Sequence, residues 1–261
     1  MSSFTLGKTA KLETITIRVK NRDEMIAFYR EIIGFTLKQE ENALAIMGIR
    51  ESVLEHLWLE ESPRAHSHFG EIKKLASYTI QVASLAELAS IYCRVLKNKI
   101  SVIDLIFTNE MIQLTLLDPE ENQLVVYVAQ PKGQAIQTPK ALLEQGDETT
   151  TLAPTTQLVG VHLNAPNKKE AMTFFQDVLG IGSEVPLLTV TDTDGKQFLT
   201  AEDEVLGLDF LKFGIEEADL LALEQHLTLK AQDFYIDKKK SILTVFDPMG
   251  VEWWFMREKG K

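Results

Sequence analysis

Apolar and polar residues alternate in two segments of the chain, residues 14–19 and 160–165, with the two-residue period of a β-strand. Each segment places three apolar side chains on one face and mostly polar or small residues on the other. The apolar positions are Ile15, Ile17 and Val19 in the first segment and Val161, Leu163 and Ala165 in the second. We therefore expect two strands, each with one face in a core and the other in a polar environment.

An amphipathic helix is expected directly after each strand. The segments NRDEMIAFYREIIGF (21–35) and NKKEAMTFFQDVLGI (167–181) match at an offset of 146 residues. In both, apolar residues recur three and four positions apart, as one face of a helix requires. Gly34 and Gly180 follow the last apolar turn, where a helix C-cap favours a residue that accepts positive φ. The match indicates an internal duplication.

A second strand–helix unit is expected in each half. Residues 77–82 precede the helical stretch LAELASIYCRVLKN, and residues 207–213 precede EEADLLALEQHL. Both halves then end on an Asp-Pro turn and a strand, from Asp118 and from Asp247. These turns are 129 residues apart, so the second half is 17 residues shorter than the offset of 146 requires. We assign the loss to the strands after its first helix.

The chain is accordingly predicted to have an α+β fold of tandem βαβββ modules in two domains, with helices outside and curved sheets inside. Residues 1–130 form the expected N-terminal domain of two modules, 131–156 a linker, and 157–261 a shortened C-terminal domain. Four such modules, with a D-P-x-x-N turn before a last strand, resemble the glyoxalase/bleomycin-resistance/dioxygenase fold of the vicinal oxygen chelate proteins.

That resemblance implies where a metal would be bound. In metal-using relatives the ligands are typically His at the start of the first strand of each paired unit and Glu in the last strand, around a site open to a chelating substrate. Transferred to this sequence, the His positions are Thr14 and Gly160, and the Glu positions are Val125 and Trp254. None of the four is the expected ligand, so we expect no cofactor.

A displaced metal site is the alternative. His162 and Glu252 lie two residues from the expected positions on the same strand faces, and the alternation of its neighbours places Asp209 on the cavity face. These three residues would suit Fe or Mn. The simpler reading is a hydrogen-bonded His162, an Asp209 paired with a cation and a solvated Glu252. Trp254 would fill the former site with apolar area and one N–H donor. All four residues are candidates for a cavity or ligand site.

The other histidines and the single cysteine are expected to be structural. His66 and His68 fall in an expected surface loop, His56 in an apolar strand and His226 in a helix. Cys93 is the only cysteine of the chain, which excludes an intrachain disulfide, and we expect a buried thiol on an apolar helix face.

The charge and hydropathy of the chain argue against nucleic-acid binding and against a membrane-spanning segment. The formal net charge is −11, and the best local basic cluster, residues 238–240, is explained by a solvated hairpin turn. Because nucleic-acid binding depends on Lys and Arg that neutralise phosphates, we expect no nucleic-acid partner. We see no signal peptide and no window of about 18–20 apolar residues that could cross a membrane. We therefore expect a soluble cytoplasmic protein, exposed outside the cell only by non-standard export or lysis.

The first half contains a closer resemblance. The segments FYREIIGFTLKQEENALAIMG (28–48) and EESPRAHSHFGEIKK (60–74) are similar to the N-terminal domain of the streptococcal and enterococcal C3-degrading proteinase family (CppA). Membership implies a glyoxalase-like fold and proteolysis of complement component C3, and it supplies no catalytic motif to transfer. The sequence has no G-x-S-x-G elbow and no H-E-x-x-H, and a strand-connecting turn explains T-D-T-D-G at 191–195.

Three functions follow from these observations. The favoured one is a metal-independent binding or regulatory protein on a degenerate vicinal oxygen chelate fold, with a small-molecule ligand or a protein partner. The second is cleavage of complement C3, which rests on the family resemblance alone. The third is a metal-dependent glyoxalase or extradiol dioxygenase that uses the displaced His/carboxylate site. Which modules pair with one another is left open by the hydrophobic pattern.

Overall fold

The computed structural model of the chain describes residues 4–7, 10–65, 73–133, 135–182, 188–193 and 205–258. Its first half contains two modules. The first consists of β1 (Lys11–Val19), α1 (Arg22–Ala27), the π-helix η1 (Phe28–Ile33), β2 (Thr36–Glu41), β3 (Leu44–Gly48) and β4 (Glu55–Glu61). The second consists of β5 (Leu75–Gln81), α2 (Leu85–Lys97), β6 (Val102–Phe107), β7 (Met111–Leu117) and β8 (Gln123–Ala129).

The second half repeats this order with fewer strands. The third module consists of β9 (Gln157–Ala165), α4 (Lys168–Thr173), the π-helix η2 (Phe174–Val178) and β10 (Leu188–Asp192). The fourth consists of β11 (Gly207–Ile215), α5 (Glu217–Leu229), β12 (Tyr235–Ile236), β13 (Ile242–Phe246) and β14 (Glu252–Arg257). Within the described residues, β10 runs parallel to β9 as β4 runs parallel to β1. Among the described residues, no strand lies between η2 and β10, whereas β2 and β3 lie at the corresponding place in the first module.

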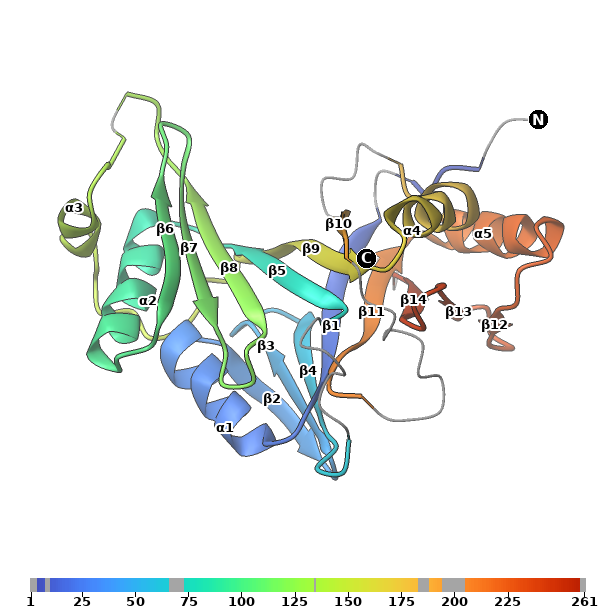
Figure 1. Cartoon of the computed structure of the whole chain (residues 1–261), viewed down its shortest axis with the longest axis horizontal. Coiled ribbons are helices and arrows are strands. Elements are labelled where there is room, and N and C mark those ends of the chain that lie inside the picture. Colours follow the sequence, from blue (N-terminus) through green and yellow to red (C-terminus); the bar gives the residue numbers. More distant parts are fainter. Residues whose placement is uncertain are drawn as a thin grey trace.

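The two sheets each combine both halves of the chain. One sheet has eight strands in the order β12-β13-β14-β11-β1-β4-β3-β2, and the other has six in the order β10-β9-β5-β8-β7-β6. The halves meet where β1 pairs antiparallel with β11 and where β5 pairs antiparallel with β9. Figure 1 shows these two strand pairs near the centre of the molecule. The first module is therefore partnered by the fourth, and the second by the third.

The matched segments of the two halves occupy corresponding places in the fold. The side chain of Asn21 accepts a hydrogen bond from the main-chain N of Glu24 at 3.2 Å, and Asn167 accepts one from Glu170 at 3.1 Å. Each cap begins an α-helix that continues as a π-helix. Each π-helix ends near a glycine of positive φ, with φ of 105° for Gly34 and 67° for Gly180. The predicted duplication is confirmed.

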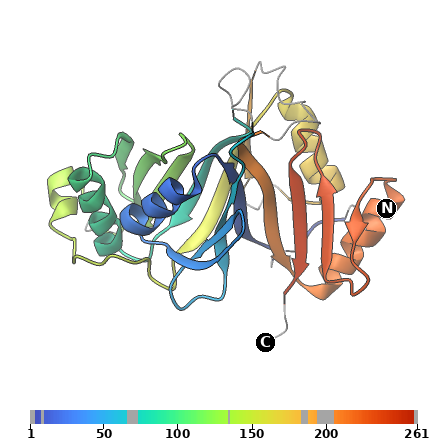
Figure 2. The same cartoon turned by 90° about the horizontal axis from the view of Figure 1, so that it is seen from below.

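Helices cover one face of each sheet. In the eight-stranded sheet α1 contacts β3 and β4, and α5 contacts β14; in the six-stranded sheet α2 contacts β8, and α4 contacts β9 and β10. Figure 2 shows α5 alongside β13 and β14, the strands of the fourth module in the eight-stranded sheet. Side chains on the helix side, such as Ile15, Leu211 and Trp253, are fully buried in the core. Each contributes roughly 1.5–3 kcal/mol through burial.

The predicted linker is attached to the first two modules along its length. Glu87 of α2 accepts hydrogen bonds from the main-chain N of Ala153 and from Thr156 Oγ1, both at 2.8 Å. Arg94 of the same helix donates to the carbonyls of Ile32 and Thr149. The segment therefore acts as a strap across the helical side of the molecule.

A short helix that the sequence analysis missed, α3 (Pro139–Leu143), lies in this linker. Thr138 caps it by accepting from the main-chain N of Ala141 at 3.3 Å, and Pro139 takes the first helical position. Thr followed by Pro is the usual start signal of a helix. No described helix has both the length and the apolar character needed to cross a membrane.

Candidate ligand-binding face

The face of the eight-stranded sheet opposite its helices carries polar and aromatic side chains in register. Thr16 on β1 pairs with Trp58 on β4 and with Phe210 on β11. Lys212 on β11 pairs with Thr14 and with Trp254 on β14. Neighbours in register point to the same side of a sheet. We name this surface the polar face and define it by Thr14, Thr16, Arg18, Trp58, Phe210, Lys212 and Trp254.

Three aromatic rings form the centre of the polar face. Phe210 and Trp254 are stacked, with ring centroids 4.5 Å apart and an interplanar angle of 11°. Trp58 meets the edge of Phe210 at 5.5 Å and 86°. Both geometries are favoured by the ring quadrupoles. Phe210 is buried but lies outside the main core cluster, so these rings form a separate apolar surface.

A buried lysine is held beside this aromatic group. The ammonium of Lys212 lies 5.3 Å from the ring centroid of Trp58 and 3.7 Å from Oε2 of Glu55. The indole N–H of Trp58 donates to the same oxygen at 3.0 Å. Burial raises the pKa of Glu13 nearby, against the opposing effect of Lys212. The charge of Lys212 is thus balanced by acidic side chains and a ring face rather than by solvent.

An arginine and two carboxyl groups close one end of the polar face. Arg18 Nη2 donates to Asp209 Oδ1 at 2.8 Å and to Glu60 Oε2 at 3.5 Å. Burial raises the pKa of Asp209, Arg18 lowers it, and the neighbouring Glu60 raises it again. The three side chains come from β1, β4 and β11, so this cluster forms only when the first and fourth modules pair.

Three buried hydrogen-bonding atoms of the polar face have no partner among the residues that the structure describes. These atoms are Thr16 Oγ1, Arg18 Nε and Trp254 Nε1. By contrast, the indole N–H of Trp253, on the core side of the same strand, donates to Asp247 Oδ2 at 3.1 Å. A buried polar atom without a partner costs about 1–3 kcal/mol. The polar face therefore holds hydrogen-bonding capacity that the described residues do not use.

The structure separates the candidate metal ligands of the sequence analysis. Asp209 and Glu252 lie on the eight-stranded sheet, where Asp209 is paired with Arg18 and Glu252 is half-buried in register with Phe210. His162 lies on the six-stranded sheet, with Nε2 2.7 Å from Thr191 Oγ1. The cause is the pairing of modules, which places the third and fourth modules on different sheets.

The side chains at the positions that the fold implies for a metal do not fit one. Thr14 and Trp254 belong to the eight-stranded sheet, and Gly160 and Val125 to the six-stranded sheet. None is a His or carboxylate ligand. Across the described ranges, no group of three His, Cys, Asp or Glu side chains could hold a metal ion. On the polar face, two carboxylates that could contribute are already bound by Lys212 and Arg18.

The corresponding face of the six-stranded sheet has a different chemistry. Its register brings together uncharged side chains, namely Ser77, Thr79, Gln81, Thr115 and Tyr127, with His162 at the junction of halves. Tyr127 donates to Gln81 Oε1 at 2.9 Å. The duplicated scaffold therefore presents one charged, aromatic face and one neutral, polar face.

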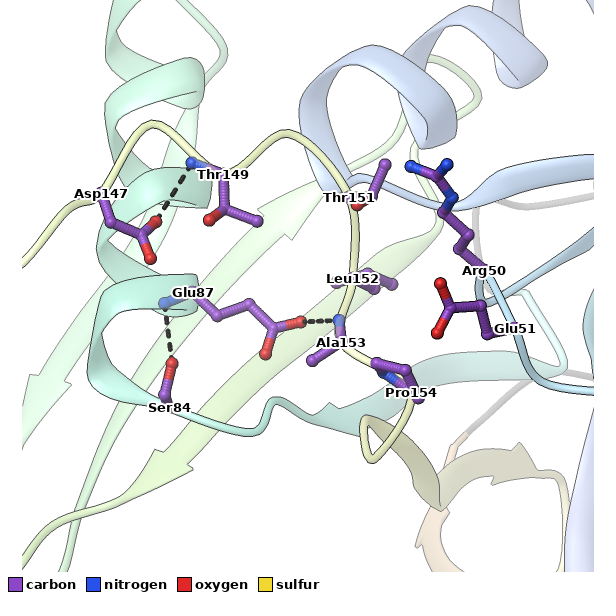
Figure 3. A pocket seen from close by; sticks show the side chains of 10 residues that line it. All are labelled: Arg50, Glu51, Ser84, Glu87, Asp147, Thr149, Thr151, Leu152, Ala153 and Pro154. Atoms are coloured by element: carbon purple, nitrogen blue, oxygen red, sulfur yellow. Dashed lines mark hydrogen bonds between the residues drawn. The ribbon is translucent and has the colours of Figure 1, made fainter.

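A separate cavity of about 310 Å³ lies between α2, the linker and the residues that follow β3 (Figure 3). In this view Arg50 and Glu51 lie on one side of the cavity and Asp147 on the other. Glu87, in the middle, is buried, and both its carboxylate oxygens accept hydrogen bonds from neighbouring protein groups. The cavity surrounds a structural junction, so we do not assign the principal site to it.

The prediction of a buried Cys93 is wrong. The thiol is on the exposed side of α2, because Leu88, Ile91, Tyr92 and Val95 define the buried side and position 93 falls between them. The hairpin predicted for residues 238–240 is confirmed by the turn between β12 and β13.

The remaining histidines lie apart from the polar-face cluster. His56 on β4 is buried; burial lowers its pKa to about 4, and its Nδ1 has no hydrogen-bond partner among the described side chains and main-chain groups. His226 Nε2 lies 2.9 Å from the carbonyl oxygen of Asp177, and the ring stacks on Phe4. His66 and His68 lie outside the described residues, as does the end of the Asp-rich turn at 194–195.

Sequence reasoning missed the side chains that form most of the polar face. Trp58, Phe210 and Lys212 are not ligand types for a metal, so the metal pattern that the fold implies does not single them out. The sequence signal for these side chains is the alternation in EHLWLEE and GLDFLKF. In these strands Trp58, Phe210 and Lys212 alternate with core residues, which are leucines and Phe213. The side of each strand was thus predictable, whereas its cross-sheet neighbours were not.

The fold is that of the glyoxalase- and dioxygenase-like proteins. Glyoxalase I from Zea mays superposes with a TM-score of 0.59 at 10% identity, over 95% of this chain and 92% of that chain. The cppA protein from Streptococcus pneumoniae TIGR4 superposes with a TM-score of 0.69 at 23% identity, over 94% and 97%. At these identities the likeness shows the fold alone.

Sequence comparison identifies the family. A model described as CppA N-terminal matches residues 12–131, and one described as CppA C-terminal matches residues 156–255. The chain belongs to the CppA family. It is also 27% identical over 183 residues to a catechol-2,3-dioxygenase of Bacillus subtilis (strain 168), a match that covers 63% of this chain and 62% of that protein. The chain therefore spans less than two thirds of this curated relative.

Proposed function

We propose that this protein binds a small organic molecule on the polar face through its own side chains, without a metal ion. The observation that carries the proposal is the presence of two buried hydrogen-bonding atoms, Thr16 Oγ1 and Trp254 Nε1, with no partner among the described residues, on a face built around stacked aromatic rings. A ligand atom that accepts a hydrogen bond would recover the cost of leaving them unpaired. The rings would supply apolar contact area.

The donors restrict the chemistry of the ligand. An indole N–H only donates, and a threonine hydroxyl both donates and accepts. The ligand is therefore expected to combine a flat or ring-shaped apolar part with an acceptor such as a carbonyl oxygen. Lys212, which is held by Glu55 and Trp58, favours a partial negative charge on that acceptor.

The proposal is tested with three ring compounds that carry an acceptor, namely acetophenone, benzamide and benzoate, added to purified protein in the presence of EDTA. Thermal shift and ligand-observed NMR measure binding. Thr16→Val removes one donor with little change of shape, and Trp254→Phe removes the indole N–H together with part of the ring, so we expect affinity to fall about three- to tenfold or more. Tyr127→Phe, on the other sheet, is the matched control and should leave affinity unchanged. Equal binding by all variants, or binding that EDTA abolishes, would refute the proposal.

Cleavage of complement C3 is implied for this chain by the family resemblance alone. No contact among the described residues specifically favours it, so it is a separate hypothesis with its own test in the Discussion. Dioxygenase chemistry, the activity named for the Bacillus subtilis relative, would require a metal-ligand set that the described side chains do not supply.

A further inference from the structure

A cavity of about 670 Å³ lies where the strap, residues 147–153, meets the first module. Its wall is formed by η1, by the start of β2, by the turn after β3 and by the strap itself. It shares Arg50 and Thr151 with the smaller cavity of Figure 3. None of its lining residues belongs to the polar face. We call it the strap cavity and treat it as a separate site.

The backbone of the strap is held in place at this cavity. The main-chain N of Leu152 donates to the carbonyl oxygen of Gly34 at 2.9 Å. The guanidinium of Arg94 on α2 donates to the carbonyl oxygen of Thr149. A Cβ added at Gly34 would lie 2.9 Å from the carbonyl oxygen of Thr150, so the strap and the end of η1 are in close contact. The threonines of the strap therefore have a fixed position beside η1.

The wall of the strap cavity is positively charged, although the chain is acidic. Two arginines and one glutamate line it, on a chain whose formal net charge is −11. Arg50 makes no hydrogen bond or ion pair with the described residues, and Figure 3 shows its guanidinium extending towards Thr151. Arg30 donates only through Nη2, to Glu31 Oε1 at 3.0 Å. Within the described part of the chain, most donors of both guanidinium groups are therefore unused.

Neutral donors and a further cation lie next to these arginines. Thr36, Thr150 and Thr151 line the same cavity, and their hydroxyl groups make no hydrogen bond with the described residues. Thr150 also lines a neighbouring cavity together with Arg94. The guanidinium of Arg94 donates to main-chain carbonyl oxygens, and no described carboxylate forms an ion pair with it. Its charge therefore adds to the positive potential at the strap.

We propose that the strap cavity binds the phosphate group of a small phosphomonoester through the guanidinium groups of Arg30 and Arg50 and the hydroxyl groups of the strap threonines. The planar guanidinium presents paired donors that match phosphate oxygens, and threonine hydroxyls can donate to the same oxygens. Leu37, which packs against the core, supplies an apolar wall for the organic part of the ligand. The volume is typical of small-molecule sites. A nucleic acid is disfavoured, because the acidic remainder of the chain repels a polyanion.

The proposal is tested by titrating purified protein with phenyl phosphate and with inorganic phosphate at constant ionic strength, followed by ³¹P NMR. We expect both to bind, and phenyl phosphate to bind more tightly because it also contacts the apolar wall. Arg30→Gln and Arg50→Gln should each raise the dissociation constant about tenfold. Both side chains are exposed, so the melting temperature of each variant should stay as in the parent protein.

Arg64→Gln is the matched control. Arg64 is also an exposed arginine, but it follows the end of β4, whereas Arg50 lies near the start of that strand. The control variant should bind phenyl phosphate as the parent protein does. An equal loss of affinity in Arg64→Gln and Arg50→Gln would overturn the proposal, because net charge alone would then explain binding. No binding by the parent protein would also overturn it, and binding of inorganic phosphate without phenyl phosphate would overturn the assignment of a phosphomonoester.

A variant of the polar face separates this site from the proposed function. Thr16→Val should leave the affinity for phenyl phosphate unchanged, and a loss in that variant would overturn the assignment to the strap cavity. Arg50→Gln should in turn leave binding of benzamide unchanged. Because the two sites share no lining residue, a negative result with phenyl phosphate does not affect the test of the polar face with ring compounds.

Discussion

Tyr29→Phe removes one oxygen atom from a chain of three buried side chains that joins the first and second modules. The hydroxyl of Tyr29, in η1, donates to Asp118 Oδ2 at 2.8 Å and accepts from the hydroxyl of Tyr78 on β5 at 2.6 Å. All three side chains are buried. In the second half the matched residue is Phe175, and Asp247 is bonded instead by the indole of Trp253. A phenyl ring therefore suits this fold, and the substitution tests the hydrogen bonds themselves.

The expected cost follows from the two bonds lost. A hydrogen bond to a charged group contributes roughly 1.5–3 kcal/mol and one between neutral groups roughly 0.5–1.5 kcal/mol. Asp118 retains Asn122 Nδ2 at 2.9 Å as a partner, which keeps the loss below the upper end of the summed range. We therefore expect Tyr29→Phe to lower the free energy of unfolding by about 2–4 kcal/mol. Tyr78→Phe removes one neutral bond and should cost about 1 kcal/mol.

Urea denaturation followed by tryptophan fluorescence measures these changes, with the slope of the transition expected to stay constant. The double variant should cost less than the sum of the single ones, because the hydroxyl of Tyr78 is no longer left without an acceptor. A loss below about 0.5 kcal/mol for Tyr29→Phe, within the ordinary effect of a surface substitution, would refute the reasoning. So would a loss no larger than that of Tyr78→Phe.

Three further predictions concern stability and activity. His56 is buried with its pKa lowered from 6.5 to about 4, so its contribution to stability, present above pH 6.5, is lost as pH falls; the loss between pH 7 and pH 5 should be about 2 kcal/mol. Urea midpoints at both pH values should show that His56→Leu reduces this difference. Gly34→Ala should destabilise by about 1–3 kcal/mol, because φ is +105° and the new Cβ would lie 2.9 Å from the carbonyl oxygen of Thr150. Gly133→Ala, which meets nothing within 4 Å, should cost less in the same assay. Finally, purified protein incubated with complement C3 should produce no more cleavage than a mock purification from the same host, and protein-dependent fragments on a gel would contradict this.

The duplication was predictable because its signals are local. Alternation of apolar residues predicts β1 and β9, and the positions of Gly34 and Gly180 predict where the helices end. The burial predicted for Cys93 from the helical period was wrong. The apolar stripe of a helix is narrow, so a shift of one position moves a residue from the buried side to the exposed side.

The composition of the site was less predictable, because it depends on which strands become neighbours. A hydrophobic pattern states which side of a strand is buried and carries no information about the strand across the sheet. His162 and Asp209 appeared to belong together because they lie in the same half of the sequence. The pairing of β11 with β1, and of β9 with β5, puts them on different sheets. The same pairing brings Thr16 and Arg18 beside Phe210 and Asp209, contacts of long sequence separation that no local signal encodes.

Ligand binding by the polar face without a metal is tested most directly by the indole N–H signals of a ¹⁵N-labelled sample. The chain has three tryptophans, Trp58, Trp253 and Trp254, and replacing each with Phe assigns its signal. Titration with benzamide or benzoate in EDTA should shift the signals of Trp58 and Trp254 and leave that of Trp253 in place, and in the Thr16→Val variant the same shifts should need about three- to tenfold more ligand. A shift confined to Trp253, no shift at any concentration, or shifts that require added manganese or iron would contradict the account.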